Sequence, residues 1–460
     1  MSNDSLENIS AVDGRYYKKT KPIAKFTSER ALFGYRVEAE CKWFLHLANN
    51  MNLKELPSLS DKETRHIQSI SENFSLTDAQ RIKAIEETTN HDVKATEYFV
   101  KERMEELPKL AKNIEFVHFG CTSEDINNIA YALMLSDCRN TLGETVTRVI
   151  KAIDTLASSC GDTAMISRTH GQTASPSTMK KELAVFAERL IVQLERLNSV
   201  IILAKMNGAV GNFNAHQIAY PEFDWLTESN NFIKSLGLTP IELTTQIEPH
   251  DYIAEYFHCF IRLNQIMLDF NQDIWHYISL DYFEQQRIVT ETGSSTMPHK
   301  VNPIDFENSE GNLGIANALL SHMANKLQIS RWQRDLSDST VLRNIGSALA
   351  HCHLAYNSAV KGLSKLAVNK TAMSSDLDKN WAVLAEAIQT IMRRYGLPEP
   401  YEQIKNLTRG KPLTEDTYHE LLNGLKGLPK DARETLELLR PENYIGLASK
   451  LGNRKARTKQ

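Results

Sequence analysis

Residues 313–327, LGIANALLSHMANKL, carry apolar side chains at alternating steps of three and four residues. The repeated positions are Leu313, Ala316, Leu320, Met323 and Leu327. This spacing places one apolar stripe along a helix and is typical of helices that pack lengthwise against other helices. The stretch therefore predicts a long buried helix.

Two more stretches show helical spacing of apolar residues, residues 181–200 and residues 253–278. The 20 Gly and 14 Pro in 460 residues are few and clustered, so that long intervals contain neither. Strand-like alternation is almost absent. We predict an all-α protein with a central bundle of long helices, divided into an N-terminal helical part at 1–111, the bundle at 112–365 and a C-terminal helical part at 366–460.

Composition excludes several classes of protein. Apolar residues make up 42% and charged residues 24% of the chain, which excludes wholesale disorder. The 53 Lys and Arg nearly balance the 57 Asp and Glu, for a net charge of −4. We therefore expect the protein to bind neither nucleic acid nor an anionic membrane. No apolar run is long enough to span a membrane, and the first ten residues do not resemble a signal peptide. The six cysteines form no CxxC, and a cytoplasmic location is expected.

The width of the apolar seams also predicts self-association. Seams shared by several helices would leave a large apolar patch exposed on a monomer. We therefore expect an oligomer in which the stripe at 313–327 packs against copies of itself.

Metal binding is not expected, although the chain has 14 His. The densest pair is His351 and His353, and side chains two residues apart on a helix point about 200° apart. They cannot hold one ion together, and the HExxH pattern is absent.

The most informative irregular segment is Gly293 to Pro303, GSSTMPHKVNP. Its Gly, Ser and Pro would also suit an ordinary connector between two helices. A serine-hydrolase nucleophile is disfavoured, because neither a GxSxG motif nor a strand-turn-helix context is present.

This segment resembles the signature of the aspartase/fumarase superfamily, GSSxMPxKxNP, at every signature position. Within that superfamily the chain is similar to the adenylosuccinate lyase family of the longer bacterial type, from Asp13-Gly-Arg-Tyr16 to Asn443-Tyr-Ile-Gly446. The resemblance implies a homotetramer with active sites shared between subunits. It also implies a cofactor-free β-elimination of fumarate from adenylosuccinate, leaving AMP, and from the succinyl-carboxamide intermediate SAICAR, leaving AICAR.

The resemblance assigns two catalytic roles. Ser294 becomes the general base, although the residues alone do not choose between Ser294 and Ser295. His170, in Ser-Arg-Thr-His-Gly-Gln, becomes the general acid for the leaving nitrogen, a role for which histidine is the usual residue type.

The resemblance also implies a set of substrate-binding residues. Lys300 and Asn302 suit the succinyl carboxylates, and arginines suit the phosphate because the guanidinium binds it bidentately. His91 is expected to contact the substrate rather than donate the proton. The full set is Arg15, Tyr16, Asn90, His91, Asp92, Thr122, Ser123, Gln246, Lys300, Val301, Asn302, Asn308, Arg334, Ser339, Thr340, Val341, Leu342 and Arg343.

Two other hypotheses remain open at this point. A related lyase of the same superfamily, such as argininosuccinate lyase, fumarase or aspartase, shares the loop. Its substrate carries no phosphate, however, and so would not require so many arginines suited to binding one. A structural protein that lost catalysis is disfavoured, because the catalytic candidates and Lys300 and Asn302 are all intact.

Overall fold

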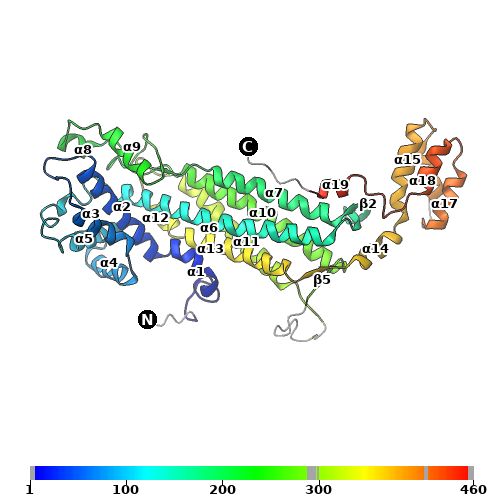
Figure 1. The fold of residues 1–460 in the computed structure, drawn as a ribbon, viewed down its shortest axis with the longest axis horizontal. Helices are drawn as coiled ribbons and strands as arrows, with labels where there is room; N and C mark the ends of the chain where they lie inside the picture. The colour runs from blue at the N-terminus through cyan, green and yellow to red at the C-terminus, as the bar shows by residue number, and fades with distance from the viewer. Residues whose placement is uncertain (1–5, 287–296, 298–299, 409–412, 454–460) are drawn as a thin grey trace. The chain divides into compact units, whose positions relative to one another are not determined.

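The structure is a computed structural model that describes residues 6–286, 297, 300–408 and 413–453. Helices account for most of these residues, and the strands among them form three short pairs. The all-α fold predicted from the sequence is therefore confirmed (Figure 1).

Short helices fold the N-terminal part of the chain. Ser75 and Asp78 form a reciprocal cap, in which the Asp78 N–H donates to the Ser75 hydroxyl (3.3 Å) and the Ser75 N–H donates to the Asp78 carboxylate (2.9 Å). Ser60 and Glu63 make the same arrangement one helix earlier. The elements are α1 (Tyr17–Thr27), α2 (Glu29–Asn49), α3 (Asp61–Glu72), α4 (Leu76–Thr89), α5 (Asp92–Met104) and the 3-10 turn η1 (Ile114–Phe116). Helix α2 contacts α3, α4 and α5.

Long helices dominate the middle of the chain (Figure 1). They are α6 (Ser123–Cys160), α7 (Met179–Ser199), α10 (Asp251–Ser279), α11 (Ile304–Leu327) and α13 (Ile345–Leu363). Shorter helices lie between them: α8 (Asn214–Ala219), α9 (Trp225–Ser235) and α12 (Ser337–Leu342).

Two compact units divide the chain. The first comprises residues 1–146, 193–265 and 311–356, and the second comprises residues 147–192, 266–310 and 357–460. Each long helix contributes residues to both units. The three-part division along the sequence, with boundaries after residues 111 and 365, stays a prediction.

The apolar stripe of α11 is buried within a single chain. Leu313, Ala316 and Leu320 are 0% exposed, and the other two stripe residues are 1% exposed. The expectation that this stripe packs against copies of itself is therefore wrong, because helices of the same chain already cover it. Ile315, two residues from Leu313 and on a different face of the helix, is 51% exposed.

The strands are short. β1 (Ala164–Thr169) and β2 (Gln172–Thr178) form an antiparallel hairpin in which Thr169 pairs with Gln172. β3 (Leu203–Ala204) and β4 (Thr239–Pro240) are parallel, and β5 (Phe283–Gln285) and β6 (Leu366–Val368) are antiparallel.

The C-terminal helices bury a small core of their own. Its most buried side chains include Ile388, Met392, Tyr418, Leu422 and Leu436. The elements are α14 (Lys370–Asp378), the 3-10 turn η2 (Trp381–Leu384), α15 (Ala385–Arg394), α16 (Pro400–Thr408), α17 (Glu415–Gly424), α18 (Lys430–Glu437) and α19 (Ala448–Gly452). α15, α17 and α18 form the group drawn in orange to red in Figure 1.

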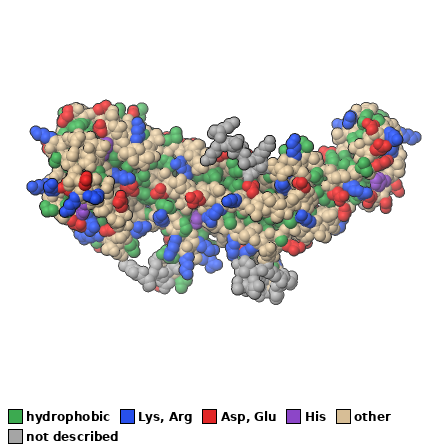
Figure 2. Space-filling view, in the orientation of Figure 1, with side chains coloured by type: hydrophobic (Ala, Val, Ile, Leu, Met, Phe, Trp, Pro, Cys, Tyr) green, Lys and Arg blue, Asp and Glu red, His purple; other side chains and the backbone are tan. Residues whose placement is uncertain are grey.

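Charged side chains of both signs are mixed over the visible face of the molecule (Figure 2). This mixture agrees with the near balance of acidic and basic residues in the sequence. Within the described residues, no helix combines the length and the apolar content that crossing a membrane requires.

Candidate active site

A cleft of about 350 Å³ opens in the first unit, between the α4–α5 turn, the beginning of α6 and helix α12. Most of its walls are polar or charged side chains, which suit a charged ligand. The lining residues are Arg36, Glu86, Asn90, His91, Asp92, Val93, Ser123, Glu124, Asn127, Tyr131, Arg334, Leu336, Ser339, Thr340, Leu342 and Arg343.

The turn between α4 and α5 brings three polar residues to the cleft. Asn90 ends α4 in the left-handed conformation (φ 48°), which Asn adopts more readily than most residues. His91 caps α5, because its Nδ1 accepts a hydrogen bond from the Lys94 N–H (3.2 Å). The proton of a neutral His91 ring therefore sits on Nε2, which can donate to a ligand.

Asp92 lies between two arginines of the cleft. Its Oδ2 is 2.9 Å from Arg36 Nη2 and 2.9 Å from Arg343 Nη2. Burial alone would raise the pKa of the Asp92 carboxyl, but the two guanidinium groups outweigh burial and hold that pKa below its usual value. Arg36 is 3% exposed whereas Arg343 is 48% exposed, so Arg343 is the arginine that can also reach a ligand.

A chain of hydrogen bonds continues from Arg36 along the floor of the cleft. Arg36 Nε donates to Asn127 Oδ1 (2.9 Å), and Asn127 Nδ2 donates to Glu124 Oε1 (2.7 Å). The same Glu124 oxygen lies 2.9 Å from Arg334 Nη2. Arg334 Nη1 then donates to Gln246 Oε1 (3.2 Å). This chain fixes Arg334 and Gln246 relative to the α4–α5 turn.

A buried histidine lies next to this chain, because Asp338, which faces His250, has its Oδ1 3.8 Å from Arg334 Nη2. His250 is 2% exposed, and its Nδ1 lies 3.3 Å from Glu248 Oε2 while its Nε2 lies 3.8 Å from Asp338 Oδ2. Burial would lower the pKa of His250, but Asp338, Glu248 and the more distant Glu124 outweigh burial and raise the pKa to about 9. His250 is therefore a cation at neutral pH.

This charge predicts how stability depends on pH. A histidine whose pKa rises on folding stabilises the protein fully below its unfolded pKa of about 6.5 and loses that contribution as the pH rises through about 9. We expect His250→Asn to lower the melting temperature strongly at pH 6.5 and weakly above pH 9. Asn fits the left-handed backbone at this position (φ 65°).

The measurement is a series of thermal melts between pH 6 and pH 9.5. His258→Asn, at an exposed position of α10, is the matched control for the loss of an imidazole. A difference between wild type and His250→Asn that does not shrink with rising pH would contradict a cationic His250.

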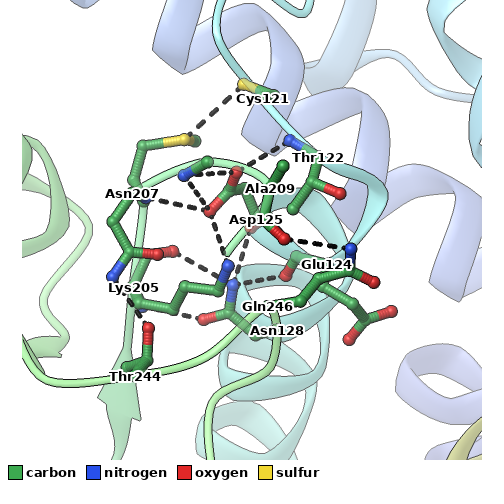
Figure 3. A network of polar contacts seen from close by, with 12 residues as sticks. Cys121, Thr122, Glu124, Asp125, Asn128, Lys205, Asn207, Ala209, Thr244 and Gln246 are labelled. Carbon is green, nitrogen blue, oxygen red and sulfur yellow. Dashed lines mark hydrogen bonds and ion pairs between the residues drawn. The ribbon is translucent and has the colours of Figure 1, made fainter. Parts of the chain in front are cut away.

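A second buried ion pair fixes the beginning of α6 (Figure 3). Lys205 Nζ lies 3.0 Å from Asp125 Oδ1, and both side chains are 0% exposed. Asp125 also accepts hydrogen bonds from the N–H groups of Thr122 (2.8 Å), Asn207 (2.9 Å) and Gly208 (3.1 Å). Because Ser123 and Glu124 lie between Thr122 and Asp125, this carboxylate sets where they enter the cleft.

Two protein families match the chain, the lyase family over residues 14–318 and the adenylosuccinate lyase C-terminal family over residues 330–445. An adenylosuccinate lyase of Escherichia coli (strain K12) is 51% identical over 449 residues, which cover 97% of this chain and 98% of that protein. An adenylosuccinate lyase of Vibrio cholerae is 52% identical over 453 residues, which cover 98% of this chain and 99% of that protein. The chain belongs to the adenylosuccinate lyase family.

A solved structure is similar in fold. The fumarate lyase from Mesorhizobium sp. BNC1 superposes with a TM-score of 0.76, covering 94% of this chain and 96% of that chain, at 17% sequence identity. The resemblance to the adenylosuccinate lyase family and its superfamily, stated from the sequence, is confirmed.

Many of the binding residues implied by the adenylosuccinate lyase family come together in the cleft. Those that line it are Asn90, His91, Asp92, Ser123, Arg334, Ser339, Thr340, Leu342 and Arg343. Thr122 and Gln246 are not lining residues but are tied to the cleft by the hydrogen bonds described above. Val341 lies in α12 and does not line the cleft, and neither do Arg15 and Tyr16, which precede α1.

The remaining family candidates belong to the second unit. His170 is exposed in the turn between β1 and β2. Lys300 is exposed and Val301 and Asn302 are half-buried just before α11, while Asn308 lies within α11. The two candidate bases, Ser294 and Ser295, lie outside the described residues.

Several lining residues of the cleft were not found from the sequence. They are Arg36, Glu86, Val93, Glu124, Asn127, Tyr131 and Leu336. Arg36 and Asn127 are themselves buried inside helices, at 3% and 7% exposed. A charged or amide residue within a helix predicted to be buried could have indicated them from the sequence, because a buried polar side chain requires a partner.

The described residues also bear on metal binding. Among them, no group of three or more His, Cys, Asp or Glu side chains is placed to hold a metal ion. His351 instead shares a hydrogen bond with Asn312 Oδ1 through its Nδ1 (2.8 Å).

Proposed function

We propose that this chain is an adenylosuccinate lyase, which removes fumarate from adenylosuccinate to leave AMP and from SAICAR to leave AICAR. The 51% identity to the Escherichia coli adenylosuccinate lyase over nearly the whole of both chains carries this proposal. The cleft supports it, because its arginines and hydroxyl groups suit a ligand that bears a phosphate.

The reaction breaks a C–N bond by β-elimination. A base removes a proton from the carbon next to a carboxylate, the electron pair forms the double bond of fumarate, and an acid protonates the departing nitrogen. Negative charge gathers on the carboxylate during this step, so donors placed around that carboxylate lower the barrier.

In this proposal Ser294 is the base and His170 is the acid. A serine can act as a base only where water is excluded and where N–H groups and a cation stabilise the alkoxide. Lys300 is the nearby cation in the sequence, and Lys300 and Asn302 also hold the succinyl carboxylates.

The first-unit cleft holds the nucleotide end of the substrate in this proposal. Arg343 binds the phosphate together with Arg15 and the hydroxyl groups of Ser339 and Thr340, while His91 donates from Nε2 to the substrate. The half-exposed guanidinium of Arg343 supports this role, because Asp92 holds one edge of it in place.

A homotetramer completes the proposal. The binding residues of the cleft belong to the first unit, whereas His170, Lys300 and Asn302 belong to the second. We propose that subunits share these groups, and that exposed apolar residues of the long helices, such as Ile315, take part in the subunit contacts. The cytoplasmic location expected from the sequence belongs to this proposal as well.

The test is an assay of the purified protein with adenylosuccinate, SAICAR and argininosuccinate, without added metal or cofactor. We expect AMP and AICAR with stoichiometric fumarate from the first two substrates and no reaction with the third. Activity on argininosuccinate alone would favour the related lyase. A protein that loses all activity when metal is stripped, and regains it with zinc, would overturn the cofactor-free reaction.

A further inference from the structure

The hairpin that carries His170 is a tight, two-residue turn. β1 and β2 pair through Thr169 and Gln172, which leaves only His170 and Gly171 in the turn. Both have positive φ angles, 53° and 72°, as the turns that best fit twisted hairpins require. The position of the His170 ring therefore depends on how the two strands are held.

Arg168 anchors the first strand two residues before His170. Its Nη2 lies 2.6 Å from Asp376 Oδ2, and its Nη1 donates to the hydroxyl of Tyr282 (3.2 Å). The Tyr282 hydroxyl in turn donates to the same Asp376 oxygen (2.5 Å). The three side chains close a triangle, so a movement of Arg168 breaks two contacts at once.

The other two corners of the triangle are fixed by their own surroundings. Tyr282 is 1% exposed, stacks on Tyr277 with ring centroids 6.1 Å apart, and its carbonyl accepts a hydrogen bond from the Asn369 N–H (2.9 Å). Asp376 lies in α14, which contacts β1. Burial, aided by Asp376, raises the pKa of Tyr282 to about 12, which keeps its hydroxyl protonated as a donor.

The second strand is held in a similar way. The Ser175 hydroxyl donates to the carboxylate of Glu386 in α15, which also accepts a hydrogen bond from the Tyr444 hydroxyl (3.0 Å). Carboxylates from α14 and α15 therefore hold both strands of the hairpin, one on each side of the turn.

We propose that Arg168, Tyr282 and Asp376 are positioning residues that fix the hairpin so that His170 can deliver its proton to the leaving nitrogen. This inference rests on the proposed function of His170. A catalytic group displaced by about 1 Å loses on the order of 100-fold in rate, whereas substrate affinity depends on other residues.

The main test is Asp376→Asn, which keeps the size of the side chain and removes its charge. We expect kcat to fall by about 10-fold or more, with KM changed by less than about 2-fold. Asp378→Asn, at an exposed position of the same helix, is the matched control and should keep wild-type kcat. Should Asp376→Asn fail to fold, Tyr282→Phe removes one hydroxyl from the triangle, keeps the buried ring, and should show a smaller fall in kcat alone.

A double-mutant cycle separates positioning from general damage to the fold. If the triangle acts through His170, Asp376→Asn (or Tyr282→Phe) should have no further effect on the residual rate of His170→Ala. If the double variant instead loses rate by the product of the two single losses, the positioning role is overturned. A wild-type kcat in Asp376→Asn would overturn it as well. Both results would leave the proposed function intact. A wild-type protein that does not cleave adenylosuccinate would instead overturn the proposed function. A fully active His170→Ala variant would overturn the catalytic role of His170. Either result would also overturn the positioning role of the triangle.

Discussion

Ser294→Ala should lower kcat by about 1000-fold or more while the protein keeps its affinity for AMP. The substitution removes the oxygen that we propose takes the proton, and no water placed by chance replaces a fixed base efficiently. The groups that we propose bind the phosphate, Arg343 among them, remain unchanged. The measurement is steady-state turnover of adenylosuccinate alongside the dissociation constant of AMP from calorimetry.

Arg343→Ala is the matched contrast and should raise KM by about 10-fold or more. A hydrogen bond to a charged group contributes about 1.5–3 kcal/mol, and its loss weakens ground state and transition state together. Arg36 still pairs with Asp92 in this variant, which limits damage to the cleft.

Near wild-type kcat in Ser294→Ala would show that Ser294 is not the base, and Ser295→Ala would then be the variant to measure.

The sequence predicted the helices well because their signal is local. Five apolar residues at steps of three and four predicted α11, and all five are buried. The same pattern could not show what covers them, because a stripe packed on the same chain and a stripe packed on a subunit look alike in sequence. The error on the α11 stripe has this origin.

The residues of the candidate site differ in the same way in how far the sequence could predict them. Residues 90–92 and Arg343 were implied by the resemblance to the adenylosuccinate lyase family, and the structure brings them into one cleft. Arg36 and Asn127 were not implied by that resemblance. They meet at the cleft only because two helices distant in sequence bring Arg36 Nε within 2.9 Å of Asn127 Oδ1. The buried cation at His250 depends equally on folding, since Asp338 is far away in the sequence.

Hybrids of two inactive variants should regain activity. Ser294→Ala and His170→Ala subunits would be mixed in equal amounts, dissociated in mild denaturant and reassembled. If each site takes Ser294 from one subunit and His170 from another, about a quarter of the sites in random tetramers receive both intact residues. We therefore expect about a quarter of the wild-type activity, from parents that have almost none.

The control is each variant taken alone through the same cycle of dissociation and reassembly, which should stay inactive. Different tags on the two variants allow mixed tetramers to be isolated before the assay, so that a failure of subunit exchange is seen directly. Verified mixed tetramers without activity would show that both residues reach each site from the same chain.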